Sequence, residues 1–165
     1  MLKISVKIVK DNLKIVMIMI NEKQIREWLG EEGLFRERVK DDDSNFHFIV
    51  EYPEGNSIDL IQPRGKEDIL IIGCATNISP EHVAFLKKSK PEEKQKLIWD
   101  FKFTINQMLL DFQIDHPNNE IKTFIISDEL YEDRLTKHKL IFKIKKIFKC
   151  KLQCMLLVEK MLSDF

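Results

Sequence analysis

The sequence has few residues that break or cross-link a chain. Glycine and proline occur five times each among 165 residues, so long disordered linkers are not expected. The three cysteines, Cys74, Cys150 and Cys154, lack the even number and the spacing of a disulfide framework, which favours reduced thiols in a cytoplasmic protein. No uninterrupted apolar run approaches about 18 residues, so we expect no membrane span.

An excess of charge of one sign is also absent. Lysine and arginine total 27, and aspartate and glutamate total 27, which gives a formal net charge of +0 at pH 7. No global field therefore draws the chain to nucleic acid or to a membrane. The hydrophobic fraction of 44% suits one compact domain with a substantial core, which we place at residues 21–165.

Residues 1–20 form a separate part of the sequence. Residues 2–9 and 13–20 partly alternate apolar and polar positions on either side of an Asp-Asn pair, a pattern that predicts a β-hairpin. In the alternative interpretation, Met17 or Met19 is the true start, and the preceding residues are an upstream extension that does not belong to the native protein. A signal peptide is not expected, because lysines interrupt the segment and a small-residue cleavage site is missing.

Turn formers divide the next part of the chain into one helix and four strands. Asn21 is a good N-cap and Gly33 a good stop signal for a helix over residues 22–32. The apolar runs that follow are separated by DDDSN, PEGN and PRGKED, and connections this short make neighbouring strands antiparallel. The expected strands of this meander are 34–40, 45–52, 56–62 and 68–74.

A longer helix is expected from Pro91 to about Phe112, after a short helix that begins at Ser79-Pro80-Glu81. This longer helix is apolar on more than one side. Its core stripe is formed by Leu97, Ile98, Phe101, Ile105, Met108 and Phe112. Trp99, Phe103 and Leu110 lie off that stripe, so we expect these three side chains to belong to a partner-binding surface.

The remaining residues predict a strand, a helix and a last strand. EIKTFII at 120–126 reads as the strand, a helix follows to about Phe148, and residues 150–158 begin as a strand. The segment would then be a βαβ unit with a right-handed crossover. The expected order is α-β-β-β-β-α-β-α-β, which is an α+β protein with an antiparallel β-meander packed by helices.

The stretches NEKQIREWLGEEGL and ISPEHVAFL, the meander at 45–74 and the helix at 91–112 together resemble a largely archaeal family of domains of unknown function. The resemblance extends over residues 21–160 and is one of pattern, without a diagnostic motif. It implies the type III secretion chaperone-like fold that YbjN-type proteins share. It also implies a small protein-binding module, commonly a homodimer, and it carries no catalytic residue.

A basic stretch near the C-terminus is the one pronounced charge feature. Between Arg134 and Val158 the chain contains one arginine, seven lysines and no acid. The plain interpretation is a solvated helix face that is balanced by acids elsewhere. In the alternative, Lys139, Lys143 and Lys146 bind an anionic partner, an anionic membrane surface or RNA.

Motifs for catalysis or metal binding do not match. An EF-hand loop counted from Asp41 would have Phe46 at position six and Tyr52 at position twelve, where glycine and glutamate are needed. PRGK at 63–66 lacks the GxxxxGK[ST] run of a P-loop, and no GxSxG elbow surrounds a serine. We therefore predict no catalytic, cofactor-binding or metal-ligating residue and no cofactor.

These observations favour binding over chemistry. We expect a cytoplasmic, non-catalytic protein-interaction module, chaperone-like and homodimeric, whose partner is another protein or a second copy. The first alternative is a nucleic-acid-binding module that uses the basic helix at 134–151. The second is an enzyme whose residues assemble from distant segments.

Overall fold

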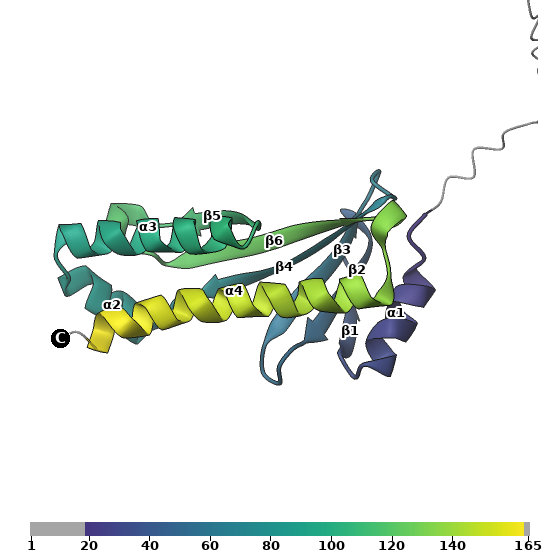
Figure 1. Cartoon of the computed structure of the whole chain (residues 1–165), viewed down its shortest axis with the longest axis horizontal. Helices are drawn as coiled ribbons and strands as arrows, with labels where there is room; N and C mark the ends of the chain where they lie inside the picture. Colours follow the sequence, from purple (N-terminus) through teal and green to yellow (C-terminus); the bar gives the residue numbers. More distant parts are fainter. Residues whose placement is uncertain (1–18, 164–165) are drawn as a thin grey trace, which may run out of the picture.

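A computed structural model describes residues 19–163 as a six-stranded antiparallel sheet with helices packed against it (Figure 1). The predicted α+β class, with an antiparallel meander packed by helices, is confirmed. The hairpin or extension expected within residues 1–20 lies outside the described residues, apart from Met19 and Ile20. Ile20 is buried, and its backbone N–H donates to the carbonyl oxygen of Glu67 at 3.2 Å.

Within residues 19–163, four α-helices and six strands are joined by short turns. The elements are α1 (Glu22–Glu31), β1 (Phe35–Val39), β2 (Ser44–Glu51), β3 (Ser57–Pro63), β4 (Ile69–Asn77), α2 (Pro80–Lys88), α3 (Pro91–Gln107), β5 (Asp111–Asp115), β6 (Thr123–Tyr131) and α4 (Lys137–Ser163). Two short 3₁₀ helices, η1 (Pro117–Asn119) and η2 (Glu132–Arg134), stand before and after β6.

The strands lie in the order β1-β2-β3-β4-β6-β5, and each pairs with its neighbours in antiparallel register. One row across the sheet joins Phe48, Leu60, Ile72 and Asp128. Because side chains alternate along a strand, this row and its alternate neighbours line a single face of the sheet. The fully buried strand residues belong to that face, so the hydrophobic core lies on one side of the sheet.

The helix α4 is the main cover of the buried face, and in Figure 1 it runs along most of the molecule beside α3. Its buried residues recur every three or four positions, as a helix packed on a sheet requires. They are Leu140, Ile144, Ile147, Cys150, Cys154 and Val158. From α3, the ring of Phe101 meets that of Phe124 on β6 edge to face, with 5.2 Å between centroids. No helix within residues 19–163 has the length and hydropathy needed to cross a membrane.

The predicted C-terminal strand at 150–158 is wrong, because these residues continue α4 to Ser163. Cys150, Cys154 and Val158 repeat at intervals of four and extend the buried stripe that begins at Leu140. A short apolar run fits either a buried strand or a buried helix by composition, and only the longer period distinguishes them. With this strand gone, the predicted βαβ unit and its parallel crossover do not exist.

The predicted strand at 120–126 is present but lies at Thr123–Tyr131, so Ser127-Asp128-Glu129-Leu130 is strand rather than the start of a helix. The predicted helix to Phe112 ends instead at Gln107, and the missed strand β5 follows. Leu109 adopts a left-handed backbone conformation (φ 53°), which turns the chain back along β6. Leucine rarely adopts this conformation, so the sequence gives no stop signal there.

Phe101→Ala and Phe103→Ala form a matched pair that tests the two sides of α3. Phe101 is 0% exposed and Phe103 is 59% exposed. Truncating the buried ring leaves a cavity, so we expect Phe101→Ala to lower the free energy of unfolding by about 3–5 kcal/mol. Phe103→Ala should lower it by less than about 1 kcal/mol. Urea unfolding followed by circular dichroism measures both, and equal losses would contradict the packing of α3.

Candidate functional site

The outer side of α3 carries an exposed pair of aromatic rings, Trp99 and Phe103, which with Lys102 we call the aromatic face. The two rings stack one helical turn apart, with centroids separated by 5.9 Å and planes inclined by 30°. Trp99 is 50% exposed and Phe103 is 59% exposed. The Nζ atom of Lys102 lies 4.9 Å from the centroid of the Trp99 ring, a cation–π contact. The rings are therefore held in place while half of their surface stays open.

A groove of about 260 Å³ lies between α3 and the C-terminal end of α4. Its apolar lining comes from both helices, and an ion pair of 2.5 Å between Lys96 and Asp100 lies at its edge. The other lining residues are Glu93, Leu97, Leu157, Lys160 and Met161. Lys96, which lines the groove, lies three positions before Trp99 on α3 and therefore on the same side of the helix. This groove thus adjoins the aromatic face.

The prediction that Leu110 shares this surface is wrong. Leu110 is 6% exposed and belongs to the hydrophobic core, whereas Leu109 is 83% exposed. The prediction carried the helical period of α3 past Gln107, where the helix ends. The left-handed conformation of Leu109 then turns its own side chain outward and the next one inward. Of the three predicted partner residues, the structure brings Trp99 and Phe103 together and separates Leu110 from them.

Lys143 and Lys146, two of the three predicted anion-binding residues, contact an acid of the protein itself. Their Nζ atoms lie 2.6 Å and 3.3 Å from the same oxygen, Oδ2 of Asp128. Lys146 in addition donates to the carbonyl oxygen of Leu109 at 3.3 Å. Asp128 sits on β6 between Ile126 and Leu130, on the face that the helices cover, and its side chain is only 15% exposed. These two lysines therefore neutralise the carboxylate of Asp128, which lies at the edge of the hydrophobic core.

Lys139, the third predicted anion-binding residue, is exposed near the start of α4 and lines a cavity of about 740 Å³. The lining contains acids as well as bases, so it has no excess of positive charge for an anion. The charged lining residues are Asp68, Glu129, Glu132, Asp133, Arg134, Lys139 and Lys143. Lys139 and Lys143 thus line the same cavity, whereas Lys146 does not belong to its lining.

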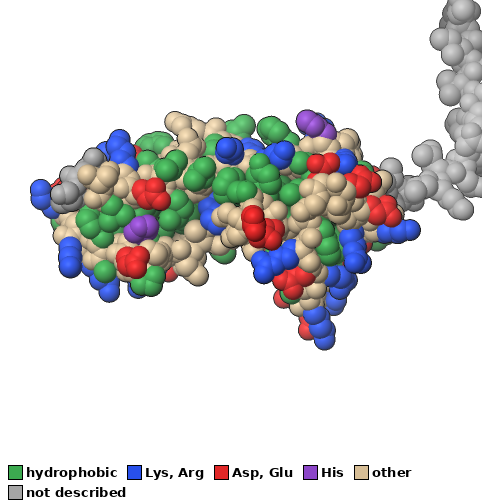
Figure 2. Space-filling view, turned by 90° about the horizontal axis from the view of Figure 1, so that it is seen from below, with side chains coloured by type: hydrophobic (Ala, Val, Ile, Leu, Met, Phe, Trp, Pro, Cys, Tyr) green, Lys and Arg blue, Asp and Glu red, His purple; other side chains and the backbone are tan. Residues whose placement is uncertain are grey.

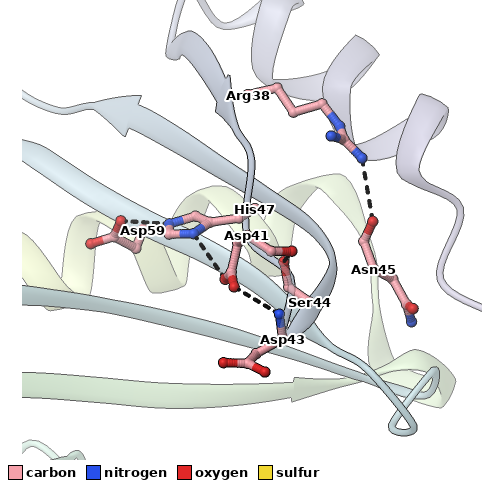
Figure 3. Close-up of polar contacts among 7 residues, drawn as sticks. All are labelled: Arg38, Asp41, Asp43, Ser44, Asn45, His47 and Asp59. Atoms are coloured by element: carbon pink, nitrogen blue, oxygen red, sulfur yellow. Dashed lines mark hydrogen bonds and ion pairs between the residues drawn. The ribbon is translucent and has the colours of Figure 1, made fainter.

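His47 joins the β1–β2 turn to strand β3 (Figure 3). Its Nε2 atom lies 2.8 Å from Oδ1 of Asp59, and its Nδ1 atom lies 3.3 Å from Oδ2 of Asp41. The backbone N–H of Asp43 donates to Asp41 at 3.0 Å. This bond is the largest cause that lowers the pKa of Asp41, and Ser44 and His47 add to it against a smaller effect of burial. Sequence spacing did not reveal this cluster, because Asp41 and Asp59 come from different segments.

The three cysteines lie together in the core. Cys150 and Cys154 are one turn apart on the buried side of α4, and Cys74 faces them from β4. Burial raises the pKa of the Cys74 thiol, and a hydrogen bond with Cys150 together with burial raises that of Cys154. A protonated, buried thiol is a poor nucleophile, which describes Cys74 and Cys154, whereas the same hydrogen bond lowers the pKa of Cys150. Within residues 19–163, no three His, Cys, Asp or Glu side chains are placed to hold a metal ion.

The surface of α4 carries exposed apolar side chains that sequence analysis did not single out. Phe142 is 60% exposed, and Leu152 and Leu156 are 38% and 50% exposed. Figure 2 shows hydrophobic side chains gathered along the length of one face, with charged side chains of both signs around them. These three residues share the outward helical phase of α4, a signal that becomes visible once the helix is extended through residue 163.

Comparison with known proteins gives a family and a similar solved structure. The model of the family described as "Uncharacterized conserved protein (DUF2299)" matches residues 21–158. The crystal structure of an uncharacterized protein from Methanothermobacter thermautotrophicus has 43% sequence identity and a TM-score of 0.82, over 84% of this chain and 96% of that chain. The predicted resemblance to an archaeal family of domains of unknown function is thereby confirmed.

A second solved structure, that of YbjN from E. coli, is similar at a lower level. It has 11% identity and a TM-score of 0.48, over 84% of this chain and 90% of that chain. No curated protein matches the chain.

Asp128→Asn tests whether the two lysines of α4 serve the fold. Removing the charge leaves two ammonium groups close together without a counter-ion, so we expect a loss of about 1–3 kcal/mol in the free energy of unfolding. Asp133→Asn is the control, because its side chain is 74% exposed and lies 4.0 Å from Arg134. Urea titration of the three proteins measures the difference. Equal stability of Asp128→Asn and the wild type would contradict a structural role.

Asp41→Asn tests the cluster around His47 through its pH dependence. The pKa of Asp41 is lowered below its ordinary value of 3.8, so the carboxylate is more stable in the folded state than in the unfolded state. Its contribution to stability is present above the unfolded pKa and disappears as pH falls through the lower, folded pKa. We expect the wild type to exceed Asp41→Asn in melting temperature at neutral pH, and the difference to shrink below pH of about 4. A difference that stays constant down to the acid transition would contradict this.

Proposed function

We propose that this protein, which belongs to the DUF2299 family, is a non-catalytic, cytoplasmic protein-interaction module that forms a homodimer through the aromatic face of α3. The observation that carries the proposal is the stacked pair Trp99 and Phe103, half exposed on a helix whose opposite side is fully buried. A chaperone-like role, in which the dimer holds a further polypeptide, is the broader function that this arrangement serves.

The aromatic face has the properties of an interface anchor. Tryptophan and phenylalanine are enriched in the buried centres of protein interfaces, where a few side chains supply most of the binding energy. Each of these rings can contribute about 2 kcal/mol when its remaining surface leaves water. The stack between Trp99 and Phe103 fixes both side chains before association, which lowers the entropic cost of binding.

A second copy fits this surface by symmetry. Two α3 helices that pack in opposite directions around a two-fold axis would place Trp99 of one copy against Phe103 of the other. The charged neighbours suit such self-pairing, because Lys96 and Lys102 alternate with Asp100 and Glu93 along the same helix. The groove between α3 and α4 adjoins the rings and offers apolar surface from Leu157 and Met161 for the edge of the interface.

The contacts of the basic helix do not favour nucleic-acid binding. Lys143 and Lys146 share Asp128, and Lys137 contacts Glu31 and Glu32 at 2.8 Å and 2.7 Å. A lysine that is paired inside the protein gains little from a phosphate, because the existing ion pair must first be broken. We therefore propose that these three lysines stabilise the folded protein rather than bind a phosphate.

Replacing both rings tests the proposal. We expect the wild type to have the mass of a homodimer at micromolar concentration in light scattering coupled to size-exclusion chromatography. Trp99→Ser combined with Phe103→Ser should have the mass of a monomer, because the interface loses its anchors. Phe142→Ser is the matched control on α4, since Phe142 is 60% exposed, and it should remain a dimer.

Circular dichroism shows whether each variant retains the fold. A wild type that is monomeric at high micromolar concentration would contradict the proposal. So would a dimer that survives the double substitution on α3 and dissociates in Phe142→Ser, because the contact would then lie on α4.

A further inference from the structure

The face of the sheet that points away from the helices is open among the described residues, and we call it the open sheet face. Its side chains are the alternate set on every strand, because the buried set of β2, β3, β4 and β6 points to the helices. Ile61 lies opposite Ile71 across β3 and β4, and Ala75 lies opposite Ile125 across β4 and β6. The aliphatic residues of this face are Val39, Ile49, Ile61, Ile69, Ile71, Ala75 and Ile125.

The middle of the open sheet face has no side chain, because Gly73 occupies it. Gly73 lies between Asp59 on β3 and Ser127 on β6. A Cβ atom at this position would come within 2.8 Å of the carbonyl oxygen of Ile126 and 3.2 Å of Cβ of Ser127. Any larger residue would therefore push β4 and β6 apart. The isoleucines around Gly73 thus surround a bare backbone against which a partner's side chain can pack.

Carboxylates border these aliphatic residues, and one of them, Asp59, lies inside the face between Ile49 and Gly73. The outward positions of strands β1 to β6 contain Glu37, Glu51, Asp59, Asp111, Asp115 and Glu129. At the outward positions of β2 to β6, His47 is the one basic side chain, and it contacts Asp41 and Asp59. Arg36 lies at the irregularity in β1, donates to Ser57 at 3.2 Å and lies 3.9 Å from Glu37.

The bases are concentrated on the opposite side of the molecule. The helix α4 covers the other face of the sheet and contains no acid before Glu159. The formal net charge of +0 therefore combines a negative open sheet face with a positive helix side. A partner that meets the open sheet face encounters an aliphatic surface with a negative border.

We propose that the open sheet face docks a basic, amphipathic segment of a partner protein, with its apolar side against Ile61 and Ile71 and its lysines or arginines against the surrounding carboxylates. Complementary charge steers such a segment to this face and disfavours acidic ones. The helix side of a second copy also carries basic and apolar residues. It lies on the opposite side of the chain, however, so pairing it with the open sheet face would give rings or open-ended assemblies rather than a two-fold dimer.

This inference deepens the proposed function, since it rests on the chain being a protein-binding module and names the chemistry of the partner. Its surface is separate from the aromatic face of α3. If one of the two surfaces proves not to bind a partner, the other can still be tested. The double substitution of Trp99 and Phe103 serves as a control below.

The test uses two synthetic peptides, an amphipathic helix of leucine and lysine and the same sequence with glutamate in place of lysine. The full-length protein, labelled at isoleucine methyl groups, is titrated with each peptide and followed by NMR. We expect saturable shifts for Ile49, Ile61, Ile71 and Ile125 with the lysine peptide. We expect no shifts from the glutamate peptide. Buried isoleucines between the helices and the sheet, such as Ile144 on α4, should stay unchanged.

Charge reversal tests the border of the face. Asp111→Lys combined with Glu129→Lys, both at exposed positions, should weaken binding of the lysine peptide by about tenfold or more. Glu159→Lys, an exposed reversal on α4, should change it by less than about twofold. The Trp99→Ser, Phe103→Ser variant should bind the peptide like the wild type, even if it has become monomeric.

Three results would overturn the inference. The first is the absence of saturable binding, and the second is binding that Glu159→Lys weakens as much as the reversal on the open sheet face. The third is growth of the wild type into assemblies larger than a dimer that the same reversal disperses, because the open sheet face would then belong to a second copy.

Discussion

The structure depends on burying one face of the six-stranded sheet under α4. This helix has 27 residues, so it extends for about 40 Å and reaches across β3, β4 and β6. Its six buried residues form one continuous stripe, and removing water from that stripe and from the sheet beneath it supplies the main stabilisation. The helices α1 and α3 pack beside α4, and α2 contacts its C-terminal half. The core is thus built on one side only, and the other face of the sheet keeps its outward side chains.

The same arrangement explains the basic character of α4. Strand alternation places Asp128 on the covered face, in line with Ile126 and Leu130, where a lone carboxylate would be costly to bury. Lys143 and Lys146 lie on the flank of α4 that passes over this point, and both contact the same oxygen. Their aliphatic stems can pack while their ammonium groups neutralise the acid. The lysines of α4, which in the sequence suggest an anion-binding helix, are therefore partly needed to neutralise Asp128 in the folded protein.

The sequence predicted well those parts whose signals are local. The turns at DDDSN, PEGN and PRGKED fixed the four-strand meander to within a few residues, because each contains residues that favour reversal. Pro80 and Pro91 marked the starts of α2 and α3 for the same reason. The outward phase of Trp99 and Phe103 was also predicted, since it follows from the helical period.

The failures have non-local or unusual causes. Leu109 ends α3 in a conformation that leucine seldom adopts. Because the sequence does not signal this end, strand β5 was not predicted, and Leu110 was predicted to be exposed although it is buried. The residues at 150–158 are apolar enough for a strand, and only packing of the whole stripe from Leu140 makes them helical. The contact of Lys143 and Lys146 with Asp128 needs the register of β6 under α4, which no spacing within either segment contains.

The zero net charge of the chain gives no indication of how its charges are distributed over the surface. Equal numbers of acids and bases leave the chain without a net charge, but they do not constrain how the charges divide between faces. At physiological ionic strength, charges interact over about 8 Å, which is less than the thickness of a sheet with a helix layer on it. A molecule at one face of the protein therefore interacts mainly with the charges of that face. The negative open sheet face, the mixed aromatic face of α3 and the basic helix side therefore differ in charge, although the chain as a whole is neutral.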